Sequence, residues 1–236
     1  QLKSILKDVN SIPGSSASYN TVGWALGFDV QYLNLSNNAS ITTASFPSGL
    51  TVFNNPIYKT ISGSNTAITT PPYIEMTRAS SQYLDGGSRT LNIATNGGFT
   101  AIIYCAFTGS AGSWERVFNF HSTFDTRDGE IVLARNSTNS FMRFEMSNGA
   151  TLLANIESAS GTVVQNEWAL WVCRYTASTK LYELFKNGVL LVSTTAGTAT
   201  ADRTATYSLI GRSQYSGDAY TSMNLAGIYV YDYFLT

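Results

Sequence analysis

Acidic side chains are the first residues of this chain whose types and spacing could do chemistry. Asp128, Gly129 and Glu130 place two acids one residue apart, whereas Glu145 and Glu157 stand alone. A retaining glycoside hydrolase needs two carboxyl groups about 5–5.5 Å apart, one as nucleophile and one as acid. Asp128 and Glu130 could share a strand face, but Gly129 interrupts the pattern. The sequence therefore predicts no paired catalytic carboxylates and no enzyme, with a glycoside hydrolase as the least favoured alternative.

The other groups that serve catalysis or phosphate binding are no better placed. The single histidine, His121, has no serine or cysteine at a recognisable spacing. The glycine-containing stretch 109–112 lacks the lysine and the strand-to-helix context of a phosphate-binding loop. A formal net charge of −1 argues against nucleic acid, because phosphate binding needs clustered Lys and Arg. No run of about 18 apolar residues occurs, so we expect no insertion into a membrane.

Loop aromatics with polar neighbours form the remaining pattern that could bind a ligand. Sugars present apolar C–H faces and polar rims, so a glycan site combines aromatic platforms with hydrogen-bonding side chains. The candidates are the platforms Trp114, Tyr215 and Tyr220, with the polar partners Asn119, Arg212, Gln214 and Asp218. Packing at the ends of the fold is the alternative for each aromatic, since scattered exposed aromatics are normal.

These residues lie among short segments that are typical of β-strands. Each segment is rich in aromatic and β-branched residues and is bounded by Gly, Asn, Ser or Asp. In chain order they are FTAIIYCAF, WERVFNF, GEIVLAR, FMRFEM, EWALWVCRYT, KLYELFKNGVLL, YSLIGRS and LAGIYVYDYFLT. Residues 99–107 and 168–175 are apolar on both faces, which predicts two central strands. Asn187-Gly188, between two alternating runs, predicts a type I′ hairpin.

Length and composition indicate one domain. A chain of 236 residues is about the upper size of a single β-sandwich. Only 12% of the residues are charged, and Ser, Thr, Asn and Gly take their place, as in secreted or particle-borne β proteins. Residues 1–20 have helical spacing of apolar residues followed by a breaker, which predicts a short helix or a linker. The sandwich is therefore expected over residues 21–236.

Several signposts follow one another in a fixed order along the chain. They are Phe99-Thr100, Glu115–Phe118, Trp168 with Arg174-Tyr175, Leu184–Gly188, Ile210–Arg212 and Leu225–Tyr231. Their order and spacing resemble the concanavalin A-like lectin/glucanase superfamily, in its laminin-G-like branch. The resemblance implies an all-β jelly-roll sandwich of two antiparallel sheets, one convex and one concave, with ligands at the concave face or loop rim. Some members are enzymes, many bind glycans and others bind only proteins, so the fold does not settle function.

A narrower likeness concerns two stretches of the sequence. GSWERVFNF, with FNNPIYKTISGSNTA upstream, resembles domains carried by virion proteins of large DNA viruses of algae. This likeness implies a place on a particle surface.

Calcium is the one cofactor that the resemblance raises. Pentraxins, relatives in the superfamily, bind calcium partly through an Asp-Asn pair; Asp128 matches that pair and Gly129 does not. Their second acidic cluster falls on the segment 212–214, which begins with Arg212, and a guanidinium cannot replace an oxygen ligand. Asp218 could partly restore the cluster. Asp128 and Asp218 are therefore the candidate metal ligands, with turn capping as the alternative.

Two cysteines, Cys105 and Cys173, lie in the middle of two predicted strands, without metal-ligand spacing or a neighbouring base. Two interpretations stay open. They are small buried thiols, or they form a disulfide, which requires neighbouring strands with Cα atoms within about 7 Å. Pentraxins bridge the corresponding strands, but their first cysteine lies nearer the strand start.

Together these features favour a non-catalytic, lectin-like carbohydrate-binding domain. Its expected role is attachment of a secreted or virion-surface protein to a glycan or glycoprotein on a cell surface. The alternative is a structural capsid or fibre module that contacts other particle proteins. Both hypotheses place the protein outside the cell or on the surface of a virion.

Overall fold

The computed structural model of the chain describes all residues except 1–25, 30–37, 43–49, 60–70, 137–139 and 236. In the described part strands dominate, and one turn of 3-10 helix spans Arg78–Ser80. No helix there has the length and apolar character that a membrane crossing needs. The helix or linker predicted for residues 1–20 lies outside the described residues.

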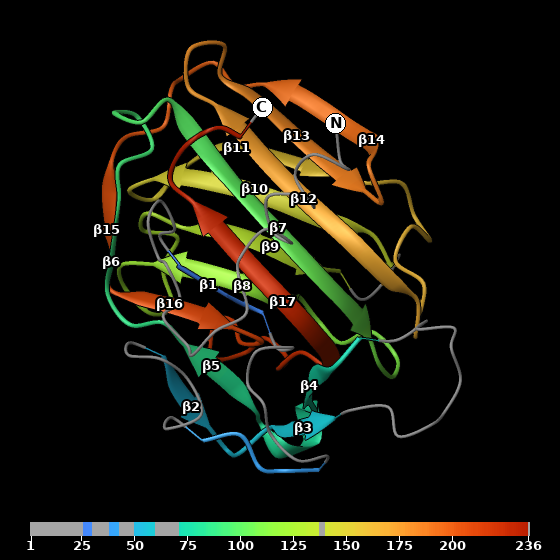
Figure 1. Cartoon of the computed structure of the whole chain (residues 1–236). Coiled ribbons are helices and arrows are strands. Elements are labelled where there is room, and N and C mark those ends of the chain that lie inside the picture. Colours follow the sequence, from blue (N-terminus) through green and yellow to red (C-terminus); the bar gives the residue numbers. More distant parts are fainter. Residues whose placement is uncertain (1–25, 30–37, 43–49, 60–70, 137–139, 236) are drawn as a thin grey trace, which may run out of the picture.

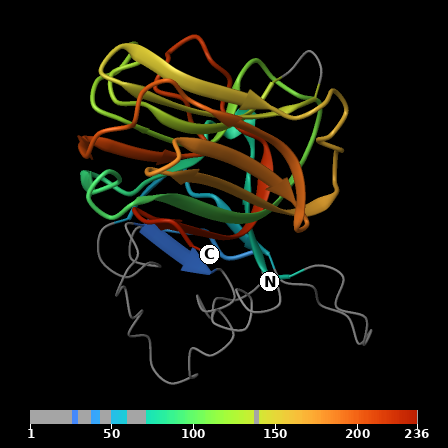
Figure 2. The same ribbon diagram turned by 90° about the horizontal axis from the view of Figure 1, so that it is seen from above.

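Two antiparallel sheets lie face to face as a sandwich (Figure 1 and Figure 2). The larger sheet has the order β14 (Val189–Thr195), β13 (Leu181–Lys186), β12 (Trp168–Thr176), β7 (Gly98–Phe107), β17 (Met223–Tyr231), β4 (Tyr73–Met76) and β3 (Ile57–Lys59), and β1 (Leu26–Asp29) also pairs with β17. The smaller sheet has the order β11 (Thr151–Glu157), β10 (Met142–Asn148), β9 (Ile131–Arg135), β8 (Glu115–His121), β16 (Tyr207–Ile210), β5 (Tyr83–Asp85) and β2 (Thr51–Phe53). A ribbon of β15 (Arg203–Ala205) and β6 (Arg89–Leu91) stands apart. This is the expected all-β jelly-roll sandwich.

Alternation along the strands directs apolar side chains into the space between the sheets. In β10, Phe144 is fully buried in the core, and so are the methionines two residues before and after it. The ring centroid of Phe99, on β7, lies 6.2 Å from that of Phe144 and 6.3 Å from that of Phe118 on β8. Because neighbouring side chains of a strand point to opposite faces, this core leaves Arg143 and Glu145 on the outer face of the smaller sheet.

The two strands predicted to be central are confirmed. β7 pairs with β12 on one side and with β17 on the other. In this register Cys173 stands opposite Ala101, and Cys105 stands opposite Ala169. Four residues along β7 separate Ala101 from Cys105, a rise of roughly 13 Å, which exceeds the Cα separation that a disulfide allows. Both cysteines are buried free thiols, and burial raises the pKa of Cys105 to about 12.

The predicted hairpin is also confirmed. β13 ends at Lys186 and β14 begins at Val189, so that Asn187 and Gly188 form the whole turn. Their φ angles are 50° and 82°, and a type I′ turn requires positive φ at both positions.

Candidate functional site

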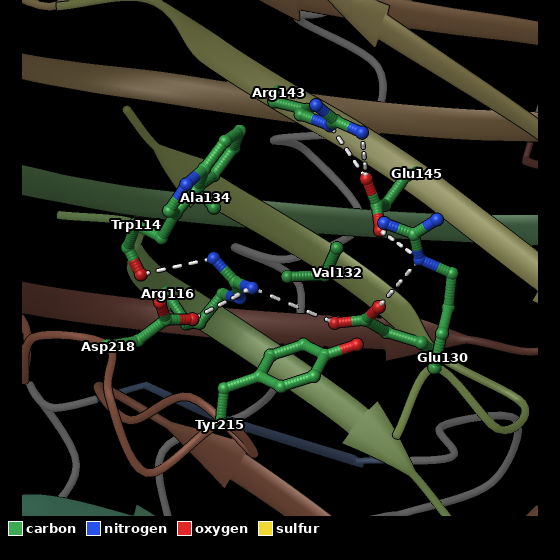
Figure 3. A pocket seen from close by; sticks show the side chains of 10 residues that line it. Trp114, Arg116, Glu130, Val132, Ala134, Arg143, Glu145, Tyr215 and Asp218 are labelled. Carbon is green, nitrogen blue, oxygen red and sulfur yellow. Dashed lines mark hydrogen bonds and ion pairs between the residues drawn. The ribbon is translucent and has the colours of Figure 1, made fainter. Parts of the chain in front are cut away.

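A pocket of about 240 Å³ opens on the outer face of the smaller sheet, over β8, β9 and β10 (Figure 3). Val132 and Ala134 of β9 form its apolar floor, and both are almost fully buried although they point away from the core. Its other lining residues are aromatic or charged: Trp114, Arg116, Arg127, Glu130, Arg143, Glu145, Tyr215 and Asp218.

A bulge in β8 turns Arg116 into the pocket. The pairing of β8 with β9 shifts register between Arg116 and Phe118, and both Val117 and Phe118 point into the core. Without this extra residue, strict alternation would give Arg116 the same inward face as Phe118. The bulge therefore places a nearly buried guanidinium on the side of the sheet that carries the pocket.

Trp114 forms one wall of the pocket in a strained backbone conformation. Its φ angle is 49°, in the left-handed region that bulky residues rarely adopt. Arg116 Nη1 donates to the carbonyl oxygen of Trp114 at 3.1 Å. The guanidinium carbons of Arg116 and Arg143 lie 5.6 Å and 5.0 Å from the centroid of the indole ring. These contacts hold the indole ring over the pocket at some cost in backbone energy.

Ion pairs with carboxylates fix Arg116 and Arg143, and each of the two arginines contacts two carboxylates. Arg116 Nη2 lies 3.1 Å from Asp218 Oδ2, which also accepts a hydrogen bond from Ser213 Oγ at 2.7 Å. Arg143 Nε and Nη2 both bind Glu145 Oε2 at 2.6 Å, and Arg143 Nη1 lies 3.1 Å from Glu157 Oε1. Both guanidiniums are thus largely committed to carboxylates of the protein.

Glu130 and Glu145 come together on one side of the pocket. Arg127 Nε lies 3.8 Å from Glu130 Oε2 and 3.7 Å from Glu145 Oε1. The expectation that Glu145 stands alone is therefore wrong, because its carboxylate lies near that of Glu130. The antiparallel pairing of β9 and β10 causes this proximity. It places Glu145 opposite Val132, two residues from Glu130.

The buried environment of Glu130 perturbs the pKa of its carboxyl group. Its side chain is buried, Asn119 Nδ2 donates to its Oε1 at 3.1 Å, and its Oε2 has no hydrogen-bond partner among the described residues. Burial, and next the negative charge of Glu145, raise the pKa of Glu130 to about 7. The carboxyl group therefore changes charge close to neutral pH.

The structure divides the predicted sugar-binding residues into three sets. Trp114, Tyr215 and Asp218 line the pocket. Asn119 and Gln214 are buried next to it, where Asn119 Oδ1 accepts a hydrogen bond from the Gln214 backbone N–H at 2.8 Å while its amide supports Glu130. The third set, Arg212 and Tyr220, lies outside the lining.

Arg212 and Tyr220 belong to an aromatic cluster beside the pocket. The guanidinium carbon of Arg212 lies 4.8 Å from the ring centroid of Tyr83 and 5.7 Å from that of Tyr220. Arg212 Nη1 also donates to Tyr83 Oη at 2.9 Å. These contacts agree with packing at the end of the sandwich, the alternative that the sequence left open.

Sequence reasoning did not identify five of the residues that line the pocket. Four of them lie within strands and one lies in the loop after β8: Arg116, Val132, Ala134 and Arg143, and Arg127. One signal was present in FMRFEM, where Arg143 and Glu145 alternate with apolar residues and so must share a face.

The surroundings of Asp128 bear on the expected calcium site. Arg203 donates from Nη1 to the carbonyl oxygen of Gly129 at 3.1 Å and from Nη2 to Asn148 Oδ1 at 3.0 Å. Arg203 is also close enough to Asp128 to feel its charge, and burial lowers the pKa of Arg203 to about 10. Asp218 is bound to Arg116. Among the described residues, no three or more His, Cys, Asp or Glu side chains are grouped to hold a metal ion.

Removal of calcium is therefore expected to leave stability unchanged. A bound ion would stabilise the fold by mass action, but a guanidinium already neutralises the oxygen-rich site beside Asp128. We expect the midpoint of thermal unfolding to shift by less than about 1 °C when EDTA is added. A clear fall with EDTA, reversed by excess calcium, would support Asp128 and Asp218 as ligands.

Comparison with known proteins gives one family and several similar folds. A sequence model of the concanavalin A-like lectin/glucanases superfamily matches residues 78–236. No curated protein matches the chain. CBM40 of the Ruminococcus gnavus IT-sialidase, bound to α2,3-sialyllactose, superposes with a TM-score of 0.53 at 13% identity, over 70% of this chain and 91% of that one.

Two toxin domains also have similar folds. The receptor binding domain of botulinum neurotoxin mosaic serotype C/D gives a TM-score of 0.60 at 10% identity, over 91% of this chain and 48% of that one. The binding domain of botulinum neurotoxin DC, in complex with rat synaptotagmin II, gives 0.57 at 11% identity, over 92% and 50%. At such identities the likeness concerns the fold alone, and the chain spans about half of each toxin domain.

Proposed function

Because the chain belongs to the concanavalin A-like lectin/glucanases superfamily, we propose that it is a carbohydrate-binding domain without catalytic activity. Its binding site is the pocket over β8, β9 and β10. The observation that carries this proposal is the combination of an indole and a phenol ring with charged hydrogen-bonding groups around one small apolar floor. Such a pocket matches the alternating apolar faces and polar rims of a sugar.

Binding of sugars by proteins of similar fold agrees with this proposal. One of the structures with a similar fold was solved with sialyllactose bound. We place the site on this chain from its own residues, since identity of 13% transfers no contact.

The position of Arg127 supports a binding role over hydrolysis. A retaining glycosidase needs its two carboxyl groups on either side of the scissile bond, about 5–5.5 Å apart. Here the guanidinium nitrogen Nε of Arg127 lies within 3.8 Å of both Glu130 and Glu145. A guanidinium nitrogen this close to both carboxylates competes with a glycosidic oxygen for the position beside them. Arg143 also holds Glu145 through two nitrogen atoms.

Substitution of Trp114 by glycine is expected to separate binding from folding. The change removes an aromatic platform, so we expect glycan binding to weaken at least about tenfold. It also relieves the positive φ angle, so the free energy of unfolding should change by less than about 1 kcal/mol. Glycan-array screening followed by titration calorimetry, with circular dichroism for stability, measures both quantities.

A matched control for this experiment is Tyr220→Ala, which removes an aromatic side chain outside the pocket. We expect it to keep glycan affinity. Equal loss of binding in both variants would place the site elsewhere, and silence of the unmodified protein on the array would contradict the proposed function.

The pair Glu130 and Glu145 favours a glycoside hydrolase as the second candidate function. Two neighbouring carboxyl groups, one of them with a raised pKa as Glu130 has, are the minimum that such chemistry requires. Release of reducing ends from β-glucans by the unmodified protein, abolished in Glu145→Gln, would support this activity and overturn the non-catalytic proposal.

Attachment to a cell surface, outside the cell or from a virion, is the biological role that we propose for glycan binding. Binding of the domain to intact cells, reduced by enzymatic removal of surface glycans, tests it. A domain that binds no glycan but binds a particle protein stably would instead be a structural capsid or fibre module.

A further inference from the structure

We propose that the sugar unit bound in this pocket carries a carboxylate, as sialic and uronic acids do, and that the terminal nitrogens of Arg127 hold it. This inference rests on the carbohydrate-binding function proposed above and specifies its ligand class. It follows from how the three arginines of the pocket use their nitrogen atoms.

Two of these arginines are occupied by partners within the protein. All three side-chain nitrogens of Arg143 bind the carboxylates of Glu145 and Glu157. The terminal nitrogens of Arg116 contact the Trp114 carbonyl oxygen and Asp218. A ligand anion would have to displace these contacts before it could bind either guanidinium.

Arg127 differs from both. Its ion pairs with Glu130 and Glu145 are recorded at Nε, at 3.8 Å and 3.7 Å, which is beyond hydrogen-bond distance. Within the part of the chain that the structure describes, no hydrogen bond is made by its Nη1 or Nη2 atom. The Arg127 side chain is also 39% exposed, against 7% for Arg116 and 14% for Arg143. Arg127 thus offers uncommitted donors at the solvent side of the pocket.

A carboxylate fits these donors better than a hydroxyl group does. The planar guanidinium presents parallel N–H groups that match the two oxygens of a carboxylate, and charge-assisted bonds of this kind are the stronger ones. The rings of Trp114 and Tyr215 remain available for the apolar faces of the sugar, and the floor of Val132 and Ala134 suits an apolar substituent.

Glu130 couples this binding to pH. Arg116 and Asn119 face it from β8, Glu145 from β10, Tyr215 from the loop after β16, and Arg127 from its own loop. Ionised Glu130 and Glu145 both attract the Arg127 guanidinium and repel a ligand anion. Because the pKa of Glu130 is about 7, acidification from pH 8 to pH 6 removes one of these charges. A sugar carboxylate with a pKa of about 3.5 stays ionised throughout, so its affinity should increase.

Titration calorimetry with matched saccharides tests the ligand class. The probes are 3′-sialyllactose, its methyl ester, lactose, and a glucuronic acid-terminated disaccharide. We expect one of the two acidic sugars to bind at least about tenfold more tightly than lactose and the ester, and the stronger one identifies the source of the carboxylate. Arg127→Gln should abolish this preference, whereas Arg174→Gln, on the larger sheet, should keep it.

The outcomes separate the two proposals. If acidic sugars bind no more tightly than lactose, the carboxylate inference is overturned. If Trp114→Gly nevertheless loses the binding of neutral glycans, the proposed carbohydrate-binding function is still supported. No binding of any saccharide would overturn both. Glu130→Gln should bind the acidic sugar with equal affinity at pH 6 and pH 8; a pH dependence that survives in this variant would overturn the role of Glu130.

Discussion

Replacement of Glu115 by glutamine is expected to lower the free energy of unfolding by about 3–5 kcal/mol, the cost of breaking a buried ion pair. Glu115 is fully buried, and its Oε2 accepts hydrogen bonds from Nε and Nη2 of Arg135, which is itself buried. Its Oε1 binds Arg78 Nη2 at 2.5 Å. The neutral amide would leave the Arg135 guanidinium in the interior without a counter-charge. Urea denaturation monitored by tryptophan fluorescence measures this loss.

Two further variants show whether the buried charge causes the loss. Glu75→Gln removes a carboxylate from a half-exposed pair with Lys59 and is expected to change stability by less than about 1 kcal/mol. Addition of Arg135→Met to Glu115→Gln removes the orphaned charge and should recover more than half of the loss, because Arg78 is 34% exposed and reaches solvent. A double variant no more stable than Glu115→Gln would contradict the explanation.

This ion pair also positions the pocket. Glu115 lies between Trp114 and Arg116, and Arg78 additionally donates from Nε to the carbonyl oxygen of Tyr220 at 3.1 Å. Arg78 therefore connects the start of β8, through Glu115, to the loop after β16, through the Tyr220 carbonyl oxygen; this loop also carries Tyr215. We infer that the geometry of the pocket depends on the buried charge of Glu115.

The fold was predictable from the sequence because its signals are local. Apolar residues on both faces of the segments that became β7 and β12 identified two central strands, and Asn187-Gly188 specified a turn by itself. Local sequence could not decide whether Cys105 and Cys173 form a disulfide or remain free thiols. It depended on the register between β7 and β12, which the sequence does not state.

The site was only partly predictable for the same reason. Loop residues such as Trp114, Tyr215 and Asp218 were recognisable because large or charged side chains among small loop residues need an explanation. Arg116 was hidden, since a bulge reversed the face that simple alternation assigns to it. Glu130 and Glu145 are far apart in sequence, and only the pairing of β9 with β10 makes them neighbours.

Two buried titratable groups of the smaller sheet should give the protein opposite and partly cancelling pH dependences. Burial lowers the pKa of His121 to about 4 from an ordinary value of 6.5, so the unfolded chain binds more protons than the folded protein between these values. Its contribution to stability is complete above pH 6.5 and is lost as the pH falls toward 4. Glu130 acts in the other sense, because its pKa rises from 4.5 to about 7. Its contribution is complete below pH 4.5 and is lost as the pH rises through 7.

Single substitutions should expose each dependence separately. Relative to the unmodified protein, His121→Phe should gain stability as the pH falls from 6.5 to 4, by up to about 3 kcal/mol, because it removes the cost of keeping the imidazole neutral. Relative to the same reference, Glu130→Gln should gain a similar amount as the pH rises from 4.5 to 7. Urea denaturation at half-unit pH steps gives both difference curves, in which the contributions of other carboxyl groups cancel. The two difference curves should slope in opposite directions with pH. Flat curves, or two curves whose slopes have the same sign, would contradict the opposing roles of His121 and Glu130.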